Sequence, residues 1–266
     1  MSAAPHELVR SHALPGVTAL ALDSARHYGR HTHDQYGIGL ILAGAQRSAS
    51  GRGPVVAGAG ELITVNPDEV HDGIPLTGAR RWQMLYFDVE LLRDDDGRLR
   101  EFTAPVARDA RAAGLFARLY ACLREPGARA GKLAPQSLLL ALRARLGACS
   151  GTAADAARID GAALAPARAR IDADPAAQHR LDALAQACGL SRYAFLRAFA
   201  RLTGLTPHAY VQQQRLHLAR RLLARGEPVA QAAADAGFAD QSHLTRLFVR
   251  DYGVTPARYG RAAPPR

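Results

Sequence analysis

The sequence has few cysteines, one lysine and no long apolar run. Its cysteines, Cys122, Cys149 and Cys188, are odd in number and scattered, so they form neither a disulfide framework nor a paired metal-binding spacing. No stretch approaches the roughly 20 apolar residues of a transmembrane helix, and the N-terminus lacks the apolar run of a secretory signal. These absences predict a protein of the reducing cytoplasm with no membrane partner.

Positive charge is in excess and unevenly distributed. Residues 161–266 carry 15 arginines against 7 acidic residues, whereas residues 1–160 carry 19 basic and 17 acidic residues. A surplus confined to one part of the chain is typical of a module that binds a polyanion such as nucleic acid. A solvated basic face is the alternative that charge alone leaves open.

The basic part of the chain contains an internal repeat. Residues 188–199 and 237–248 each combine a glycine turn, a helix-capping residue (Ser191 or Asp240) and a helix with one apolar face. The copies are 49 residues apart at the caps and 48 apart upstream, so the extra residue lies in the turn. A generic helical array is the alternative, but two copies with recurring polar residues favour a paired binding unit.

Each copy is followed by the pattern Gly-x-Thr-Pro-x-x-Tyr, where threonine caps a helix and proline fills its first turn. Together these motifs resemble the DNA-binding domain of the AraC family of bacterial transcription regulators. The resemblance covers residues 165–266 and implies two helix-turn-helix units joined by a long helix, expected over 207–223. The residues that carry it are Leu184-Ala185, Gly189-Leu190-Ser191, Arg197, Phe199, Gly204-x-Thr206-Pro207-x-x-Tyr210, Arg215-Leu216, Gly237-Phe238-x-Asp240-Gln241-Ser242-His243, Arg246, Phe248 and Gly253-x-Thr255-Pro256-x-x-Tyr259.

The same resemblance places eight side chains where the two recognition helices meet DNA. Arginine can donate twice to guanine, glutamine can pair with adenine, and hydroxyls suit phosphates. The predicted DNA-binding residues are Arg192, Tyr193 and Arg197 in the first helix and Gln241, Ser242, His243, Thr245 and Arg246 in the second. Packing of Tyr193 on Phe195 or Leu190, and an ion pair of Arg197 with Asp182, are the alternatives.

Residues 1–105 show the pattern of a β domain. Short apolar or alternating runs are separated by Gly, Pro and Asn turns, which predicts a barrel or jelly roll. The arrangement resembles the cupin-type effector domain of the same family. The expected fold is therefore α+β with two domains: a cupin-like β-barrel followed by helices, and an all-α double helix-turn-helix. The predicted strands are Val17–Leu22, Tyr36–Leu42, Gln46–Ser50, Val55–Ala57, Leu62–Val65 and Trp82–Val89.

Three histidines, His31, His33 and His71, flank these strands and are candidates for ligand contact. Metal cupins combine a His-x-His pair with a glutamate shortly after it and a later histidine, and imidazole suits transition metals. Here no glutamate follows His33 until Glu61. We therefore predict hydrogen bonds from the histidines to an effector, with metal binding and a purely structural role as alternatives.

Four further side chains are predicted to line the effector site: Tyr36, Trp82, Met84 and Tyr86. In an alternating strand Trp82, Met84 and Tyr86 share one face, and the residues between them point to the other. Core packing is the alternative for such a stripe.

Residues 106–149 read as two amphipathic helical segments interrupted at residues 125–127. The AraC family uses helices here for dimerisation, so a homodimer is expected. Residues 150–164 are small and aperiodic, which predicts a linker.

Taken together, the sequence predicts a cytoplasmic, non-enzymatic transcription regulator without a cofactor. Its expected partners are a double-stranded DNA operator, a small-molecule effector in the barrel and RNA polymerase. The alternative is a metal-dependent cupin enzyme fused to a DNA-binding module. Non-specific DNA packaging is disfavoured, because the two recognition helices present different side chains.

Overall fold

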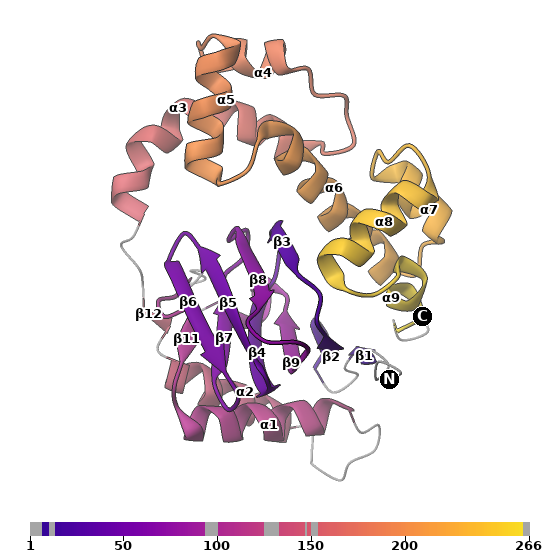
Figure 1. Ribbon diagram of the computed structural model, residues 1–266. Coiled ribbons are helices and arrows are strands. Elements are labelled where there is room, and N and C mark those ends of the chain that lie inside the picture. Colours follow the sequence, from indigo (N-terminus) through magenta and orange to yellow (C-terminus); the bar gives the residue numbers. More distant parts are fainter. Residues whose placement is uncertain are drawn as a thin grey trace. The chain divides into compact units, whose positions relative to one another are not determined.

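The computed structural model describes residues 7–10, 14–93, 101–124, 133–146, 148–149 and 154–262. Its internal contacts divide the chain into two compact units, Met1–Gly151 and Thr152–Arg266. The first is rich in strands and the second is helical (Figure 1). The predicted two-domain α+β class is thus confirmed. None of the described helices combines the length and apolar character needed to cross a membrane.

Two antiparallel sheets build the N-terminal unit, in the orders β1-β2-β9-β4-β7-β11 and β3-β8-β5-β6, with β10 and β12 paired separately. The sheets face each other, since Tyr28 of one meets Trp82 of the other edge to face at 6.0 Å. Among the described strands no pairing joins these two sheets into a closed ring. The bounds are β1 (Glu7–Arg10), β2 (Val17–Ser24), β3 (Tyr28–His31), β4 (Tyr36–Ala43), β5 (Ala45–Ser50), β6 (Gly53–Gly58), β7 (Leu62–Val65), β8 (His71–Pro75), β9 (Arg80–Phe87), β10 (Glu101–Phe102), β11 (Val106–Ala107) and β12 (Ala148–Cys149).

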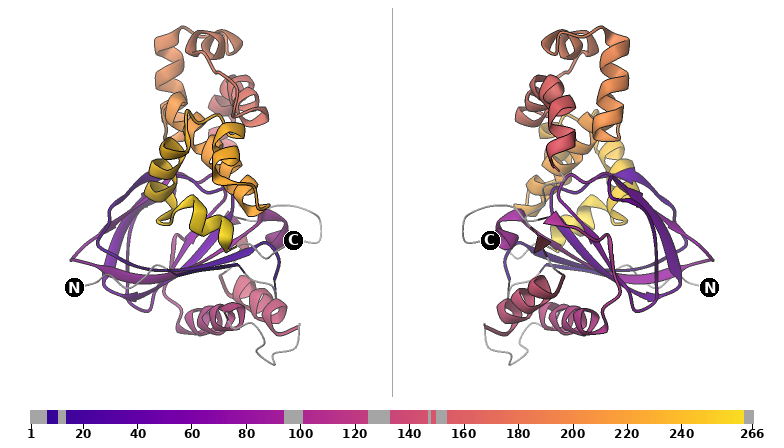
Figure 2. Two further views of the ribbon diagram at one scale, coloured as in Figure 1. Left: turned by 90° about the vertical axis from the view of Figure 1, so that its right-hand side faces the viewer. Right: turned by 90° about the vertical axis from the view of Figure 1, so that its left-hand side faces the viewer.

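The apolar core of this unit lies between the six-stranded sheet and two helices, α1 (Ala110–Arg124) and α2 (Leu133–Leu146) (Figure 2). Strands β4 and β9 pair with Ile38 opposite Leu85, so both side chains point to the helices. Both are fully buried with Phe116 of α1. The predicted helical segments are present, and the predicted interruption at 125–127 lies outside the described residues. A short 3-10 turn, η1 (Val89–Leu92), follows β9.

Helix α6 (Pro207–Ala224) is the long connector of the C-terminal unit, as expected from the sequence. Figure 1 shows α4 (Leu181–Ala187) and α5 (Arg192–Thr203) towards one end of it, and α7 (Val229–Asp235), α8 (Gln241–Tyr252) and α9 (Pro256–Arg261) towards the other.

Helix α3 (Ala154–Ala173) occupies part of the segment expected to be a linker. Leu164, Ala167 and Ile171 are fully buried. They recur at helical spacing and form the apolar stripe by which the later turns of α3 pack on the unit.

Both copies of the sequence repeat form the same hydrogen bonds in the turn and at the helix cap. The side chains of Ser191 and Asp240 accept from the backbone N–H three residues later, at 3.3 and 2.6 Å. Just upstream, the N–H of Leu190 and of Phe238 each donate to the carbonyl five residues earlier, at 3.0 and 2.9 Å. These turn bonds are 48 residues apart and the caps 49, so Ala239 is the extra residue of the second turn.

One arginine joins the two halves of the repeat. The guanidinium of Arg215, on α6, donates to the carbonyl of Gly237 in the turn before α8 at 2.7 Å. It also donates to the carbonyls of Pro175, Ala176 and Ala177 before α4, at 2.9, 3.3 and 3.0 Å. The connector helix therefore holds a loop of the first half against the turn of the second.

The two turn glycines provide a matched test of this contact. Gly189 and Gly237 both have positive φ, but a Cβ at Gly237 would meet the Ala176 backbone at 2.7 Å, whereas Gly189 has nothing within 4 Å. Left-handed geometry costs a non-glycine residue about 1–2 kcal/mol in either case. We expect Gly189→Ala to cost about 1 kcal/mol and Gly237→Ala about 1–3 kcal/mol more, through overpacking.

Denaturant unfolding followed by far-ultraviolet circular dichroism measures this difference in the helical unit. The fluorescence of Trp82, the single tryptophan, reports on the N-terminal unit and should not change. Equal costs at the two glycines would contradict the contact with Ala176.

Candidate functional site

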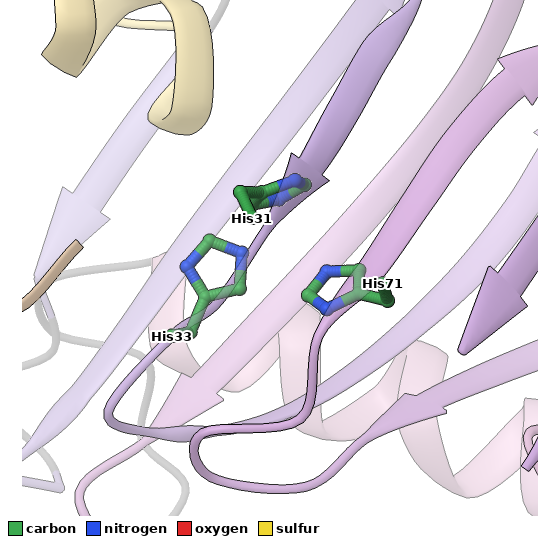
Figure 3. Close-up of side chains that lie close together, drawn as sticks. All are labelled: His31, His33 and His71. Atoms are coloured by element: carbon green, nitrogen blue, oxygen red, sulfur yellow. The ribbon is translucent and has the colours of Figure 1, made fainter. Parts of the chain in front are cut away.

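Three histidine rings converge between the two sheets of the N-terminal unit (Figure 3). His31 ends β3, His33 follows in the next loop and His71 begins β8. One nitrogen from each ring lies within 4.8 Å of the others. The ring centroids are 4.4 Å apart for His31 and His71, and 4.9 and 5.3 Å from His33 to these two. The structure therefore brings together the three histidines that the sequence singles out.

Backbone pairing and hydrogen bonds fix two of these rings. His31 and His71 are direct partners in the β3–β8 register. Their Nδ1 atoms lie 2.7 and 2.9 Å from the carbonyl oxygens of Gly29 and Glu69. Because a carbonyl only accepts, each Nδ1 carries the proton and donates. In the neutral ring this leaves the lone pair on Nε2.

His31 and His33 are buried, while His71 is half-buried. Burial, followed by the neighbouring His31 imidazole, lowers the pKa of His71 from its usual 6.5 to about 3. At neutral pH this ring is therefore uncharged, and its Nε2 can accept a hydrogen bond or bind a cation.

The inner face of β9 extends the site away from the histidines. Trp82 and Met84 are buried there, and the Tyr86 hydroxyl lies 3.5 Å from Nε2 of His33. Met84 lies across two glycines of β4: a Cβ at Gly39 would overlap its sulfur. Trp82, Met84 and Tyr86 thus share the face that alternation predicts.

Tyr36 lies on the opposite face, so its predicted place in the effector site is wrong. It pairs with Phe87 in the β4–β9 register, and both residues belong to the apolar core beneath the helices. Its ring meets Phe102 edge to face at 5.7 Å. In β4 the residues that face inward are Gly37 and Gly39, whereas Tyr36 and Ile38 face the helices.

Arg80 is a site residue that the sequence analysis missed, although it continues the alternation of Trp82. It is 2% exposed, and its Nε donates to Gln46 Oε1 at 2.7 Å. Its other nitrogens donate to the carbonyls of Arg26 and Gly73, and its guanidinium lies 4.4 Å from the Trp82 ring centroid. Within the described part of the chain no carboxylate pairs with it, and burial lowers its pKa. The interior thus holds a positive charge balanced only by dipoles and aromatic faces.

A second arginine supports the segment that carries His71. Arg52 pairs with Glu69 at 2.8 Å and donates to both the hydroxyl and the carbonyl of Thr64 and to the carbonyl of Phe102. The other carboxylate oxygen of Glu69 accepts from the N–H of Asn66 at 2.9 Å. Since the Glu69 carbonyl orients His71, this network fixes one wall of the histidine cluster.

In the C-terminal unit, α5 exposes the three predicted side chains of its first turns. Tyr193 is 68% exposed, so it packs neither on Phe195 nor on Leu190. The Arg197 guanidinium lies 4.6 Å from the Tyr193 ring centroid. Asp182 pairs with Arg192 at 2.9 Å, not with Arg197. Arg197 and Tyr193 form an exposed cation–π pair next to the helix start.

Helix α8 presents the second set. Gln241, Ser242 and Arg246 are exposed. His243 is half-buried, with its ring edge to face with Phe238 at 5.4 Å, and the Thr245 hydroxyl donates to the Gln241 carbonyl at 2.8 Å. No carboxylate of the described chain pairs with Arg246. Three of these five side chains are thus fully presented to solvent, and two are partly engaged within the unit.

This geometry defines the class of the protein: a two-sheet domain with a polar interior, and a helical domain with two capped recognition-type helices. Comparison with known families agrees with both parts. The AraC-like ligand binding domain matches residues 14–142, and a helix-turn-helix domain matches residues 184–262. The chain belongs to the AraC family of transcriptional regulators.

Two proteins of similar sequence carry the names of transcriptional regulators. The probable transcriptional regulator LumQ of Photobacterium leiognathi is 42% identical over 71 residues, 26% of this chain and 29% of LumQ. The activator RclR of Escherichia coli is 34% identical over 80 residues, 30% of this chain and 28% of RclR. These matches span less than a third of the relatives' length.

Among solved structures, ToxT of Vibrio cholerae aligns over 93% of this chain and 98% of its own, with a TM-score of 0.55 and 11% identity. At this identity the likeness concerns the fold. At 93% of the chain, the alignment includes residues of both units.

The Arg52 network predicts a measurable contribution to stability. We expect Arg52→Ala to destabilise the N-terminal unit by about 2–4 kcal/mol, because several buried acceptors and Glu69 lose their donor. Arg47→Ala removes an equally charged but exposed side chain of β5 and should change stability by less than about 0.5 kcal/mol. Urea unfolding monitored by Trp82 fluorescence compares the two, and similar values would refute the network.

Proposed function

We propose that the chain is a sequence-specific DNA-binding transcription regulator controlled by a small-molecule effector bound in its N-terminal unit. The observation that carries the proposal is the pair of capped helices α5 and α8, each presenting polar side chains beside an apolar face. Family membership supports the same role. We propose no enzymatic activity for the N-terminal unit, in line with the regulators among its relatives.

On DNA, α5 and α8 would each enter the major groove with their N-terminal turns, and α6 would set their separation near one helical turn, ~34 Å. We assign base reading to Arg197 in α5 and to Gln241 and Arg246 in α8, since these groups are exposed and match guanine and adenine edges. The remaining predicted side chains, Arg192, Tyr193, Ser242, His243 and Thr245, are assigned to sugar and phosphate contacts and to support of the readers.

For the effector, the proposed site is the inner surface formed by His31, His33, His71, Trp82, Met84 and Tyr86. The buried charge of Arg80 beyond Trp82 favours a ligand with an anionic group. A ToxT structure contains an unsaturated fatty acid, but at 13% identity that likeness concerns the fold. The anionic class therefore rests on Arg80.

We further propose a cytoplasmic homodimer that contacts RNA polymerase at its promoters. Helices α1 and α2 supply the proposed subunit contact: Leu140 is 66% exposed, and the two helices line an open groove of about 640 Å³ with Leu115 and Leu138 on its walls. For the finer organisation we propose residues 1–105 as the effector domain, 106–149 as the dimerisation segment and 165–266 as the DNA-binding domain.

Substitutions on α8 test base reading. We expect Arg246→Ala and Gln241→Ala each to weaken operator binding by about 1–3 kcal/mol and to relax the preference at one or two base pairs, because a bidentate contact is lost. Arg170→Ala is the charge-matched control for Arg246→Ala, since Arg170 is exposed and belongs to α3, outside both recognition helices. Gel-shift titrations against the operator and against random DNA give the comparison. An equal loss on both would mean that Arg246 contacts phosphate only.

The C-terminal unit is expected to act as an independent module. A fragment of residues 152–266 should fold and bind operator DNA, with an affinity that falls steeply between 50 and about 200 mM salt as arginine contacts release counterions. Circular dichroism and fluorescence anisotropy measure the two properties. An unfolded fragment would contradict the independence of the C-terminal unit, and binding that is insensitive to salt would contradict the proposed arginine–phosphate contacts.

A further inference from the structure

The histidine cluster has the arrangement of a metal-binding site rather than of a group of isolated hydrogen-bonding side chains. His31, His33 and His71 offer one ring nitrogen each, and all three nitrogens lie within 4.8 Å of one another. Figure 3 shows the rings pointing toward a common region from β3, from the following loop and from β8. Three convergent imidazoles are the ligand set of a mononuclear centre with one open position.

The backbone prepares two of the ligands. The carbonyls of Gly29 and Glu69 accept from Nδ1 of His31 and His71, which leaves each Nε2 with its lone pair. In metalloproteins the second ring nitrogen of a ligating histidine commonly donates in this way, which fixes the tautomer and orients the ring. The arrangement around His31 and His71 therefore supplies the outer contacts that a metal site requires.

The spacing is close to that of an occupied site. Nitrogens bound to one tetrahedral ion at 2.0–2.1 Å lie roughly 3.3 Å apart. Contraction from within 4.8 Å therefore takes shifts of about 1 Å, within the range of side-chain rotation. His33 lies on the loop after β3, and its carbonyl accepts from the N–H of Asp68 at 2.7 Å, which ties this loop to the segment that leads to His71.

We propose that His31, His33 and His71 bind one divalent ion of a late first-row transition metal, of the class of Zn²⁺, Ni²⁺ or Co²⁺. Three neutral imidazoles favour these ions over Mg²⁺, Ca²⁺ or Mn²⁺, which prefer oxygen ligands. Among the described residues no carboxylate joins the cluster, which distinguishes it from the mixed histidine–carboxylate set of metal cupins. Tyr86 borders the cluster, with its hydroxyl 3.5 Å from Nε2 of His33.

A bound ion would link β3 and β8, which are neighbours in one sheet, to the loop after β3, which leads to β4 of the other sheet. The ion's regulatory meaning rests on the function proposed above: either the ion is the signal, or it anchors an anionic effector through its open position. The binding site itself depends only on the three histidines.

Metal titration of the untagged full-length protein, stripped with a chelator, tests the assignment. Calorimetry with Zn²⁺ should give one ion per chain. Co²⁺ should give the visible absorption of a nitrogen-bound centre, without the thiolate band expected if Cys122 or Cys188 took part. His71→Ala and His33→Ala should each lower the affinity by more than about 100-fold, since loss of an outer contact alone costs 10–100-fold. His27→Ala, which removes an exposed histidine of the same unit, should leave it unchanged.

A second measurement covers variants that fold poorly. In the wild type Zn²⁺ should raise the melting temperature followed by Trp82 fluorescence, because an ion that binds only the folded state stabilises it. Absence of stoichiometric binding by the folded wild type, or binding unchanged in the folded histidine variants, would overturn the assignment.

Gel shifts on metal-free and metal-loaded samples separate this inference from the proposed function. If the protein binds the operator but no metal, the metal-binding proposal is wrong and the proposed regulator stands. If it binds metal but no operator in either sample, the metal site stands and the proposed regulator is wrong.

Discussion

The guanidinium of Arg215 is the interaction on which the geometry of the helical unit depends. It is planar, carries five donors and serves carbonyls from two segments that lie far apart in sequence. A lysine has no such fork and would leave carbonyls without a donor. Because Arg215 extends from the rigid connector α6, it fixes the turn before α8 and the loop before α4 in one frame.

Other polar contacts along α6 reinforce this frame. Gln213 donates to Asp251 of α8 at 2.7 Å, and Arg220 reaches the Tyr259 hydroxyl at 3.3 Å. At the other end, the Tyr210 hydroxyl donates to Asp172 of α3 at 2.8 Å. Directional bonds of this kind specify register where apolar packing alone would allow neighbouring helices to slide. Helix α6 is therefore bonded at fixed positions along its length to α3, α8 and α9.

In the N-terminal unit, the two faces of the six-stranded sheet differ in character: one packs in the apolar core and the other faces the histidines. Alternation sends Leu85 and Phe87 towards the helices and Trp82 and Met84 towards the histidines. The apolar face stabilises the unit, so the inner face is free to carry polar and charged groups that a single core would not tolerate. Conservative substitutions on the inner face are therefore expected to leave the fold intact.

The sequence predicted the helical unit well because its signals are local. Caps, turn glycines and the Thr-Pro starts lie within a few residues of the bonds that they make. The inner site was predicted less completely. The phase of β4 depends on its pairing with β9, which a single strand does not reveal, and so Tyr36 was assigned to the wrong face. Arg80 and the Arg52 network were missed because their partners are brought together only by sheet pairing, across 34 residues for Arg80 and Gln46.

The caps of the two recognition helices differ in charge, so the two halves of the repeat are not equivalent. Ser191 begins α5 with a neutral hydroxyl, whereas Asp240 begins α8 with a carboxylate. A negative cap stabilises its own helix but repels an approaching phosphate. The two ends of the unit therefore differ in the charge at the start of the helix that each presents. Two such ends cannot be exchanged, so an asymmetric half-site would be read in a single direction along the duplex.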